Sequence, residues 1–127
     1  MIGQGDGPNN GEVNADNFVV SNNIALDNGR DGIRESGATG PNNQFINNIL
    51  WNNGTKRINL KSGSQSGTKM VDPGFVNFQL NGSGDYHLKA GSPALGVGVQ
   101  LGAPAVDFDG KPRPQEGGVD IGPFQQQ

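Results

Sequence analysis

The 127-residue sequence contains no cysteine, and it has only one histidine and one tryptophan. Without cysteine, neither a disulfide bond nor a thiolate metal site can form. No apolar run is long enough to cross a membrane, and no signal peptide is recognisable at Met1. These absences predict a chain that does not insert into a membrane and is not held together by covalent cross-links.

The excess of one sign of charge over the other is also small. The formal net charge is −3, and the nine Lys and Arg residues are scattered. Such a balance argues against nucleic acid as a partner. The 22 glycines and 8 prolines are numerous, yet the apolar residues are regularly placed. The composition therefore favours one ordered domain rich in turns, with abundant Asn to adopt the left-handed backbone that sharp corners require.

One eight-residue motif occurs twice, 25 residues apart, as NNIALDNG at 22–29 and NNILWNNG at 47–54. The same offset aligns Val20 with Phe45 and Ile33 with Ile58. A period in the twenties is typical of solenoids, whose coils bury apolar side chains only by stacking on a neighbour. Because no segment shows helical periodicity, the repeat predicts stacked β-coils.

We divide the chain into an irregular arm (1–15), β-coils (16–89) and a C-terminal capping segment (90–127). Turn signals bound short strands predicted at 18–20, 24–26, 32–35, 45–46, 49–51, 57–61, 69–71, 75–76 and 85–88. The shared repeat positions predict a set of side chains in the interior: Val20, Ile24, Leu26, Ile33, Phe45, Ile49 and Ile58. The cap is expected to close the last coil with Phe108, Val119, Ile121 and Phe124.

The repeat, followed by Asp31-Gly32-Ile33, resembles the coil pattern of right-handed parallel β-helix proteins of the pectate-lyase-like superfamily. The tail is similar to the C-terminal end of many secreted bacterial β-helix proteins, in the segments 72–75 (DPGF), 85–94 (DYHLKAGSPA), 107–114 (DFDGKPRP) and 118–122 (GVDIG). The resemblance covers about residues 17–124. It implies an all-β right-handed parallel β-helix of few coils with an irregular C-terminal cap. It also implies an extracellular or cell-surface location, and it indicates fold more specifically than activity.

The segment 27–35 (DNGRDGIRE) is similar to the Asp-Asp-Gly-x-Asp calcium segment of one lyase family. That resemblance would imply acidic calcium ligands and a Lys or Arg base. Only Asp31 matches cleanly, because Arg30 and Arg34 stand where two of the acids would be. Two cations disfavour a site that needs six or more oxygen ligands. We therefore predict no metal, no cofactor and no catalytic residue, and expect a solvated row of charges on one sheet face.

A basic cluster at residues 56–61 lies one coil further on. The 25-residue offset places Lys56 over Asp31 and Asn59 over Arg34. A polar face of both signs could bind an acidic or neutral glycan by hydrogen bonds and ring stacking. Trp51 takes the position of Leu26, which favours a core filler over a sugar platform. The predicted carbohydrate face comprises Arg30, Asp31, Arg34, Glu35, Lys56, Arg57, Asn59 and Lys61.

Two features of the tail are predicted to be structural. His87 has no second histidine or nucleophile near it in sequence, which is weak support for acid–base catalysis. The Asp107-x-Asp109-Gly110 stretch lacks the later acids of a calcium loop. It is expected to form a tight turn in which Asp107, Asp109 or Asp120 pairs with Arg113.

These observations leave two functional hypotheses. The favoured one is a non-catalytic β-helix module that binds or scaffolds polysaccharide or oligosaccharide in an extracellular polysaccharide-associated system. The alternative is the C-terminal piece of a polysaccharide lyase or glycoside hydrolase acting on acidic polysaccharide. The Gly-rich residues 1–15 should shield the first coil poorly, so we also expect a homo-oligomer through the open N-terminal coil.

Overall fold

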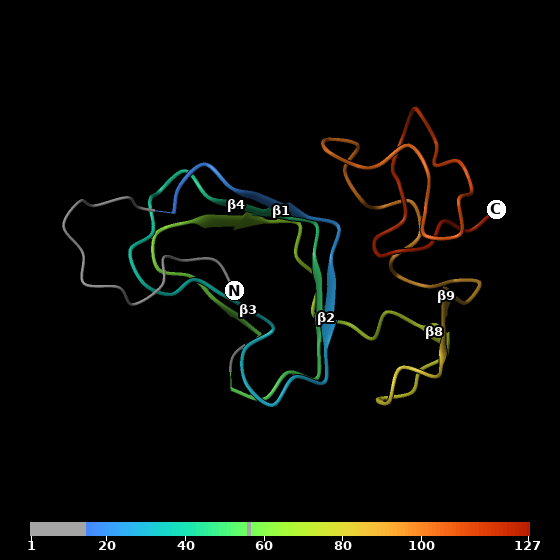
Figure 1. Ribbon diagram of the computed structural model, residues 1–127, viewed down its shortest axis with the longest axis horizontal. Coiled ribbons are helices and arrows are strands. Elements are labelled where there is room, and N and C mark those ends of the chain that lie inside the picture. Colours follow the sequence, from blue (N-terminus) through green and yellow to red (C-terminus); the bar gives the residue numbers. More distant parts are fainter. Residues whose placement is uncertain (1–14, 56) are drawn as a thin grey trace.

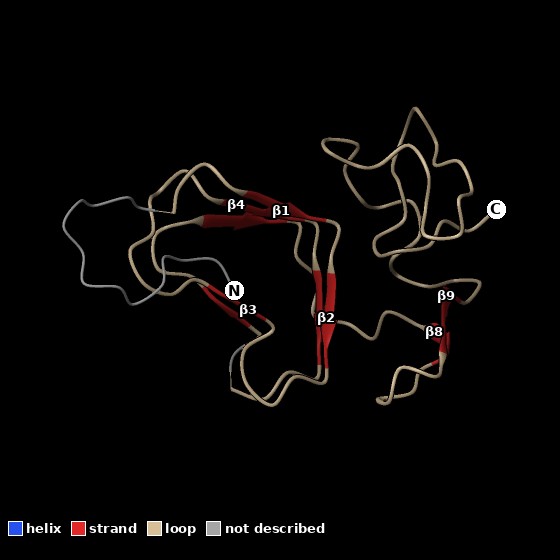
Figure 2. Cartoon of the chain, in the orientation of Figure 1, coloured by secondary structure: helices blue, strands red, loops and turns tan. Residues whose placement is uncertain are grey.

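The computed structural model describes residues 15–55 and 57–127, and in these residues it contains strands and turns but no helix (Figure 2). Consequently no helix of the described chain is long and apolar enough to span a membrane. The strands are β1 (Val19–Ser21), β2 (Ile24–Leu26), β3 (Ile33–Arg34), β4 (Gln44–Ile46), β5 (Ile49–Trp51), β6 (Ile58–Asn59), β7 (Ser64–Ser66), β8 (Phe75–Asn77) and β9 (Asp85–Leu88).

Most strands pair in parallel with an equivalent strand elsewhere in the chain. The sheet orders are β1-β4-β7, β2-β5 and β3-β6. The register joins Val20 to Phe45 and Ile33 to Ile58, which confirms the 25-residue offset read from the sequence. We call the chain carrying β1–β3 layer 1 and that carrying β4–β6 layer 2. Layer 3 consists of β7 and a single parallel bridge between Lys69 and Ile49.

Asparagine forms the corners between strands. Asn22 and Asn47 have φ of 59° and 48°, in the left-handed region that asparagine tolerates. A second set of asparagines joins the layers. Asn48 Oδ1 accepts a hydrogen bond from the Asn23 backbone N–H at 3.0 Å, and Asn48 Nδ2 donates to the Val20 carbonyl at 2.9 Å. These amides supply the layer-to-layer hydrogen bonds at the corners, where the strands themselves have ended.

The chain leaves the layers after residue 71. Strands β8 and β9 then form an antiparallel hairpin, which lies within the stretch predicted as coils. We call residues 89–127 the C-terminal segment, which contains turns and two isolated antiparallel bridges. Figure 1 shows the hairpin and this segment on the side of the stack that carries β2.

The C-terminal segment lies along the side of the layers, and this corrects the prediction of a cap over the last coil. Asn22 Nδ2 of layer 1 donates to the Val99 carbonyl at 2.7 Å. Asn47 Nδ2 of layer 2 donates to the Val97 carbonyl, also at 2.7 Å. Lys69 Nζ of layer 3 donates to the Pro93 carbonyl at 3.0 Å. Residues 93–99 of the segment therefore contact all three layers in turn.

Two of the four expected plugs are buried against the side of the stack. Val119 and Ile121 are each 1% exposed, whereas Phe108 is 81% exposed. Phe124 is half-buried and stacks on the His87 ring, with the ring centroids 4.0 Å apart.

A hydrophobic cluster lies between the layers, the β8–β9 hairpin and the C-terminal segment. Ile49 is fully buried and packs with Phe75, Leu88, Ala94 and Ile121, while Ile24 and Leu26 pack against the same cluster. The prediction that these three layer residues point into the interior is therefore wrong. Alternate residues of a strand face opposite sides, so the fully buried Leu50 is the β5 residue that faces inward. Both sides of β5 are thus covered by protein at Ile49 and Leu50.

Candidate functional site

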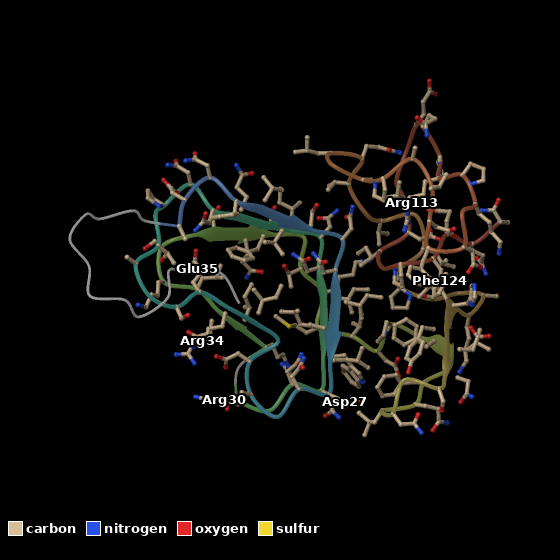
Figure 3. All side chains as sticks on the ribbon, in the orientation of Figure 1. Asp27, Arg30, Arg34, Glu35, Arg113 and Phe124 are labelled. Carbon is tan, nitrogen blue, oxygen red and sulfur yellow. The ribbon has the colours of Figure 1, made fainter. Side chains whose placement is uncertain are left out.

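The predicted carbohydrate face is centred on β3 and β6. Arg34 and Asn59 are partners in the parallel register, as predicted. We call the group Arg30, Asp31, Arg34, Arg57 and Asn59 the β3–β6 face. Figure 3 shows Arg30 and Arg34 on the side of the stack away from the C-terminal segment. Lys56 lies outside the described residues.

Asp31 orients the two partners of this face. Its carboxylate lies 3.8 Å from Arg34 Nε and accepts a hydrogen bond from Asn59 Nδ2 at 3.1 Å. The Asp31 side chain is 8% exposed, whereas that of Arg34 is 39% exposed. A largely buried anion therefore lies beside the guanidinium of a partly exposed Arg34.

A shallow hollow of about 410 Å³ adjoins this face at the corner between β5 and β6. It is lined by Asn53, Gly54, Thr55, Arg57 and Ile58. The backbone of this corner is tied to layer 1, since the Thr55 N–H donates to the Arg30 carbonyl at 3.2 Å. Arg30 and Arg57 are both exposed. The hollow thus has one cationic wall and a backbone fixed by the neighbouring layer.

Glu35 does not belong to the exposed face, because it is only 2% exposed. Its Oε2 accepts backbone N–H bonds from Lys61, Ser62 and Gly63 at 2.7, 2.9 and 3.0 Å, and its Oε1 accepts from Asn43 Nδ2 at 3.0 Å. Burial acts to raise the pKa of Glu35, but these hydrogen bonds outweigh it and hold the pKa below its usual value. Glu35 is a buried carboxylate that closes the turn at 61–63.

A signal for this placement was present in the sequence. Successive strand residues face opposite sides, so an outward Arg34 implies that Glu35 points inward. Lys61 is also directed away from the β3–β6 face, since its Nζ donates to the Gly37 carbonyl at 2.8 Å. Glu35 and Lys61, although part of the predicted carbohydrate face, therefore form hydrogen bonds within the turns of layers 1 and 2.

Trp51 is separated from the charged residues. It is 37% exposed and lies on β5 in register with Leu26. Alternation along β5 places it on the same outward side as Ile49, which faces the C-terminal segment. The aromatic ring and the β3–β6 face consequently do not form one site.

The calcium-like segment has its acids bound to neighbouring side chains. Asp27 Oδ1 accepts a hydrogen bond from Asn52 Nδ2, and Asp31 contacts Arg34 and Asn59. Within residues 15–55 and 57–127, no three Asp, Glu or His side chains converge on a point where a metal ion could be held. The absence of a metal in the functional protein stays a prediction.

His87 is held at both ring nitrogens. Nδ1 lies 2.6 Å from Asp85 Oδ1, and Nε2 lies 2.9 Å from Asp109 Oδ2, which also contacts Lys111 Nζ at 3.3 Å. The hydrogen bonds to Asp109 and then to Asp85 raise the pKa of His87. The imidazole links β9 to the C-terminal segment, in agreement with a structural role. The Asp109 partner is 22 positions away and carried no sequence signal.

Arg113 forms none of the predicted carboxylate pairs within the described chain. It is 7% exposed. Its guanidinium donates to the carbonyl oxygens of Asp120, Gly122 and Pro123 at 3.2, 2.9 and 3.1 Å, and to Gln125 Oε1 at 3.3 Å. Four neutral acceptors at the end of the chain thus replace the expected ion pair.

Asp107 instead organises its own turn and the end of the chain. Its carboxylate accepts backbone N–H bonds from Gln125 at 2.9 Å, Asp109 at 2.9 Å and Lys111 at 2.8 Å. The bond from Gln125, ahead of the others, lowers the pKa of Asp107. Its oxygens are therefore occupied by backbone groups.

Comparison with known proteins found no match from which the role of these residues could be inferred. No family model matches the chain, and neither a curated protein nor a solved structure matches it.

Proposed function

We propose that this chain is a right-handed parallel β-helix of few coils that acts as a non-catalytic module, binding or scaffolding carbohydrate in an extracellular polysaccharide-associated system. The observation that carries the proposal is the β3–β6 face. There Arg34 and Asn59 lie in register on neighbouring strands and share a buried Asp31 carboxylate.

The chemistry of this face suits sugar hydroxyls and carboxylates. An asparagine amide both donates and accepts hydrogen bonds, and a guanidinium offers a planar fork that matches a carboxylate. The Asp31 carboxylate, 3.8 Å from Arg34 Nε, favours an ordered guanidinium, and order before binding reduces the ordering cost. Three arginines accompany a single acid on this face, so an acidic glycan is favoured over a neutral one.

The lack of catalysis is supported by the contacts of three titratable groups, Glu35, Asp107 and His87. The carboxylates of Glu35 and Asp107 accept backbone N–H bonds, and both nitrogens of His87 contact carboxylates. A general acid or base needs a free position toward the substrate. The alternative, a C-terminal piece of a polysaccharide lyase or glycoside hydrolase, would place its catalytic coils outside this chain.

Screening on a glycan array, followed by calorimetry on the acidic hits, tests the proposal. Arg34→Ala should weaken binding about tenfold or more, because a hydrogen bond to a charged group contributes about 1.5–3 kcal/mol. Arg34→Lys, which keeps the charge but loses the fork, should recover only part of the affinity. Lys89→Ala, at an exposed cation on the hairpin side, is the matched control and should bind normally.

Two results would contradict the proposal. The first is the absence of any glycan that binds the parent chain and loses affinity in Arg34→Ala. The second is release of an unsaturated product absorbing in the near ultraviolet, which would favour the lyase alternative.

A further inference from the structure

Three asparagines in residues 15–55 and 57–127 are each followed directly by glycine: Asn28, Asn53 and Asn81. A further pair, at 10–11, lies outside the described residues. Glycine has no side chain to shield its backbone nitrogen, so that nitrogen can attack the amide carbon of the preceding asparagine. Because the reaction is intramolecular, its rate depends on how the fold holds the two groups.

The pairs at Asn28 and Asn53 are held by hydrogen bonds between layers 1 and 2. Asn53 Oδ1 accepts from the Asn28 backbone N–H at 3.2 Å and from Asn28 Nδ2 at 2.8 Å. Asn53 Nδ2 donates to the Ala25 carbonyl at 2.9 Å. The Gly54 N–H is itself bound to the Asn28 carbonyl, at 2.8 Å. Both amides are therefore directed toward a neighbouring layer, and the Gly54 nitrogen is engaged.

The third pair lies at the tip of the β8–β9 hairpin, where the asparagine amide bonds to its own turn. Asn81, Gly82 and Ser83 are all exposed. Asn81 Oδ1 accepts hydrogen bonds from the Ser83 backbone N–H at 3.0 Å and from Ser83 Oγ at 2.7 Å. The first of these bonds closes a small ring that includes the Gly82 nitrogen. The amide carbon of Asn81 is therefore kept near the nitrogen that would attack it.

The two Ser83 donors are directed at the atom that gains charge in this reaction. Attack on the amide carbon moves negative charge onto Asn81 Oδ1, and donors already aimed at such an oxygen lower the barrier. The Gly82 N–H donates to the Gln79 carbonyl at 3.2 Å, the long end of the usual range, so little is lost when it opens. Gly82 has φ of 81°, which favours glycine, so the turn and the reaction need the same residue.

We propose that Asn81 is a site of spontaneous deamidation in the folded protein, and that Asn28 and Asn53 are protected by the layers. The Gly82 nitrogen forms a bond to Asn81 Cγ and loses its proton to base in the solvent. The bond from Cγ to Nδ2 breaks, and the amide nitrogen takes up a proton and leaves as ammonia. Water then adds to one of the two carbonyls of the resulting succinimide and opens the ring.

The two directions of ring opening give different hairpin tips. One gives aspartate, which keeps the acceptor for the Ser83 donors. The other gives isoaspartate, in which an extra carbon enters the main chain between β8 and β9. Either product replaces a neutral amide with a carboxylate, so the formal net charge of −3 becomes one unit more negative. The inference does not depend on glycan binding, because the β3–β6 face is formed by other strands.

A time course in mildly alkaline buffer, analysed by peptide mapping with mass spectrometry, tests the proposal at each asparagine separately. In the folded parent, Asn81 should deamidate ahead of Asn28 and Asn53. In urea, where the layers are lost, the rates at Asn28 and Asn53 should rise about tenfold or more relative to that at Asn81. Enzymatic methylation of isoaspartate should detect that product at position 81, because direct hydrolysis of the amide gives aspartate alone.

Ser83→Ala tests the role of the hydroxyl donor. In the folded protein it should slow the reaction at Asn81 about two- to tenfold, which is the net contribution of one hydrogen bond expressed as a rate. In urea the variant and the parent should react at the same rate. Ser64→Ala, at an exposed serine on β7, is the matched control and should leave the rate at Asn81 unchanged. Circular dichroism confirms that each variant is folded.

Three outcomes would overturn the proposal. One is faster deamidation at Asn28 or Asn53 than at Asn81 in the folded parent. Another is the same order and ratio of rates in buffer and in urea, which would show that the fold has no influence. The last is an unchanged rate in folded Ser83→Ala, or aspartate as the sole product at position 81.

Discussion

The layers and the C-terminal segment are ordered by different means. In the layers, parallel strands repeat the same register, and asparagine amides join equivalent corners. In the C-terminal segment, individual side chains bond to backbone groups: Asp107 to three N–H groups and Arg113 to three carbonyls. Repetition can replace specific side-chain anchors where strands pair, and an irregular chain needs an anchor at nearly every turn.

The two regions are in contact at Ile49, so a substitution there should destabilise both of them. Ile49→Ala should lower the free energy of unfolding by about 2–5 kcal/mol, because the side chain is fully buried. Trp51 reports on the layers and Tyr86 on the hairpin, so urea unfolding can be followed at each by fluorescence and near-ultraviolet dichroism. Both transitions should shift together. Val76→Ala, at a 46% exposed site, should change stability by about 0.5 kcal/mol or less. Movement of only one probe would show that the regions unfold independently.

Glu35 is the exception in the layers, since it is a single anchor of the kind found in the C-terminal segment. Glu35→Ala should cost about 1–3 kcal/mol, because partly buried N–H groups at 61–63 lose their acceptor. The Trp51 transition should move more than the Tyr86 transition. Arg57→Ala, at an exposed site one layer away, serves as control and should be nearly neutral. An unchanged midpoint in Glu35→Ala would refute the anchoring role.

The smallest effect is expected from His87, whose charge links the hairpin to the C-terminal segment. Its pKa is raised, so its stabilising contribution is complete below the unfolded pKa and is lost as pH rises through the folded pKa. The pKa values of Asp85 and Asp109 are lowered, Asp85 chiefly by the His87 backbone N–H and Asp109 by the His87 ring. Their contribution is present above their unfolded values and is lost as pH falls through the folded ones.

The melting temperature of the parent should therefore decrease as the pH is raised from about 6 to about 8.5, the interval around the usual histidine pKa. His87→Gln should flatten this decline and affect the Tyr86 probe rather than the Trp51 probe. Parent and variant curves that stay parallel over this interval would contradict the assignment.

The pairings of the layers could be predicted because the same spacing occurs twice in the sequence, and a 25-residue offset fixes which residues are neighbours. β7 was missed because Ser64–Ser66 contains no apolar residue and its register is shortened. The outward direction of Ile24 and Ile49 could not be predicted from the repeat. It depends on which side of the stack the C-terminal segment covers, and that contact joins residues far apart in sequence.

The candidate site was predictable in part for the same reason. Arg34 and Asn59 follow from the repeat, whereas the anchoring role of Glu35 needs strand alternation and knowledge of the turn at 61–63. The contacts of Arg113 depend on where the chain end folds back, and no local pattern encodes this.

The three side contacts at Asn22, Asn47 and Lys69 limit how the gene could change in length. The C-terminal segment contacts consecutive layers through Val99, Val97 and Pro93, so the spacing of these contacts has to match the spacing of the layers. A 25-residue unit duplicated between layers 1 and 2 would displace Asn22 from Val99 by one strand spacing, about 4.8 Å. A unit added in front of layer 1 would leave all three contacts intact. Repeat expansion is thus tolerated in front of layer 1 and penalised between the layers.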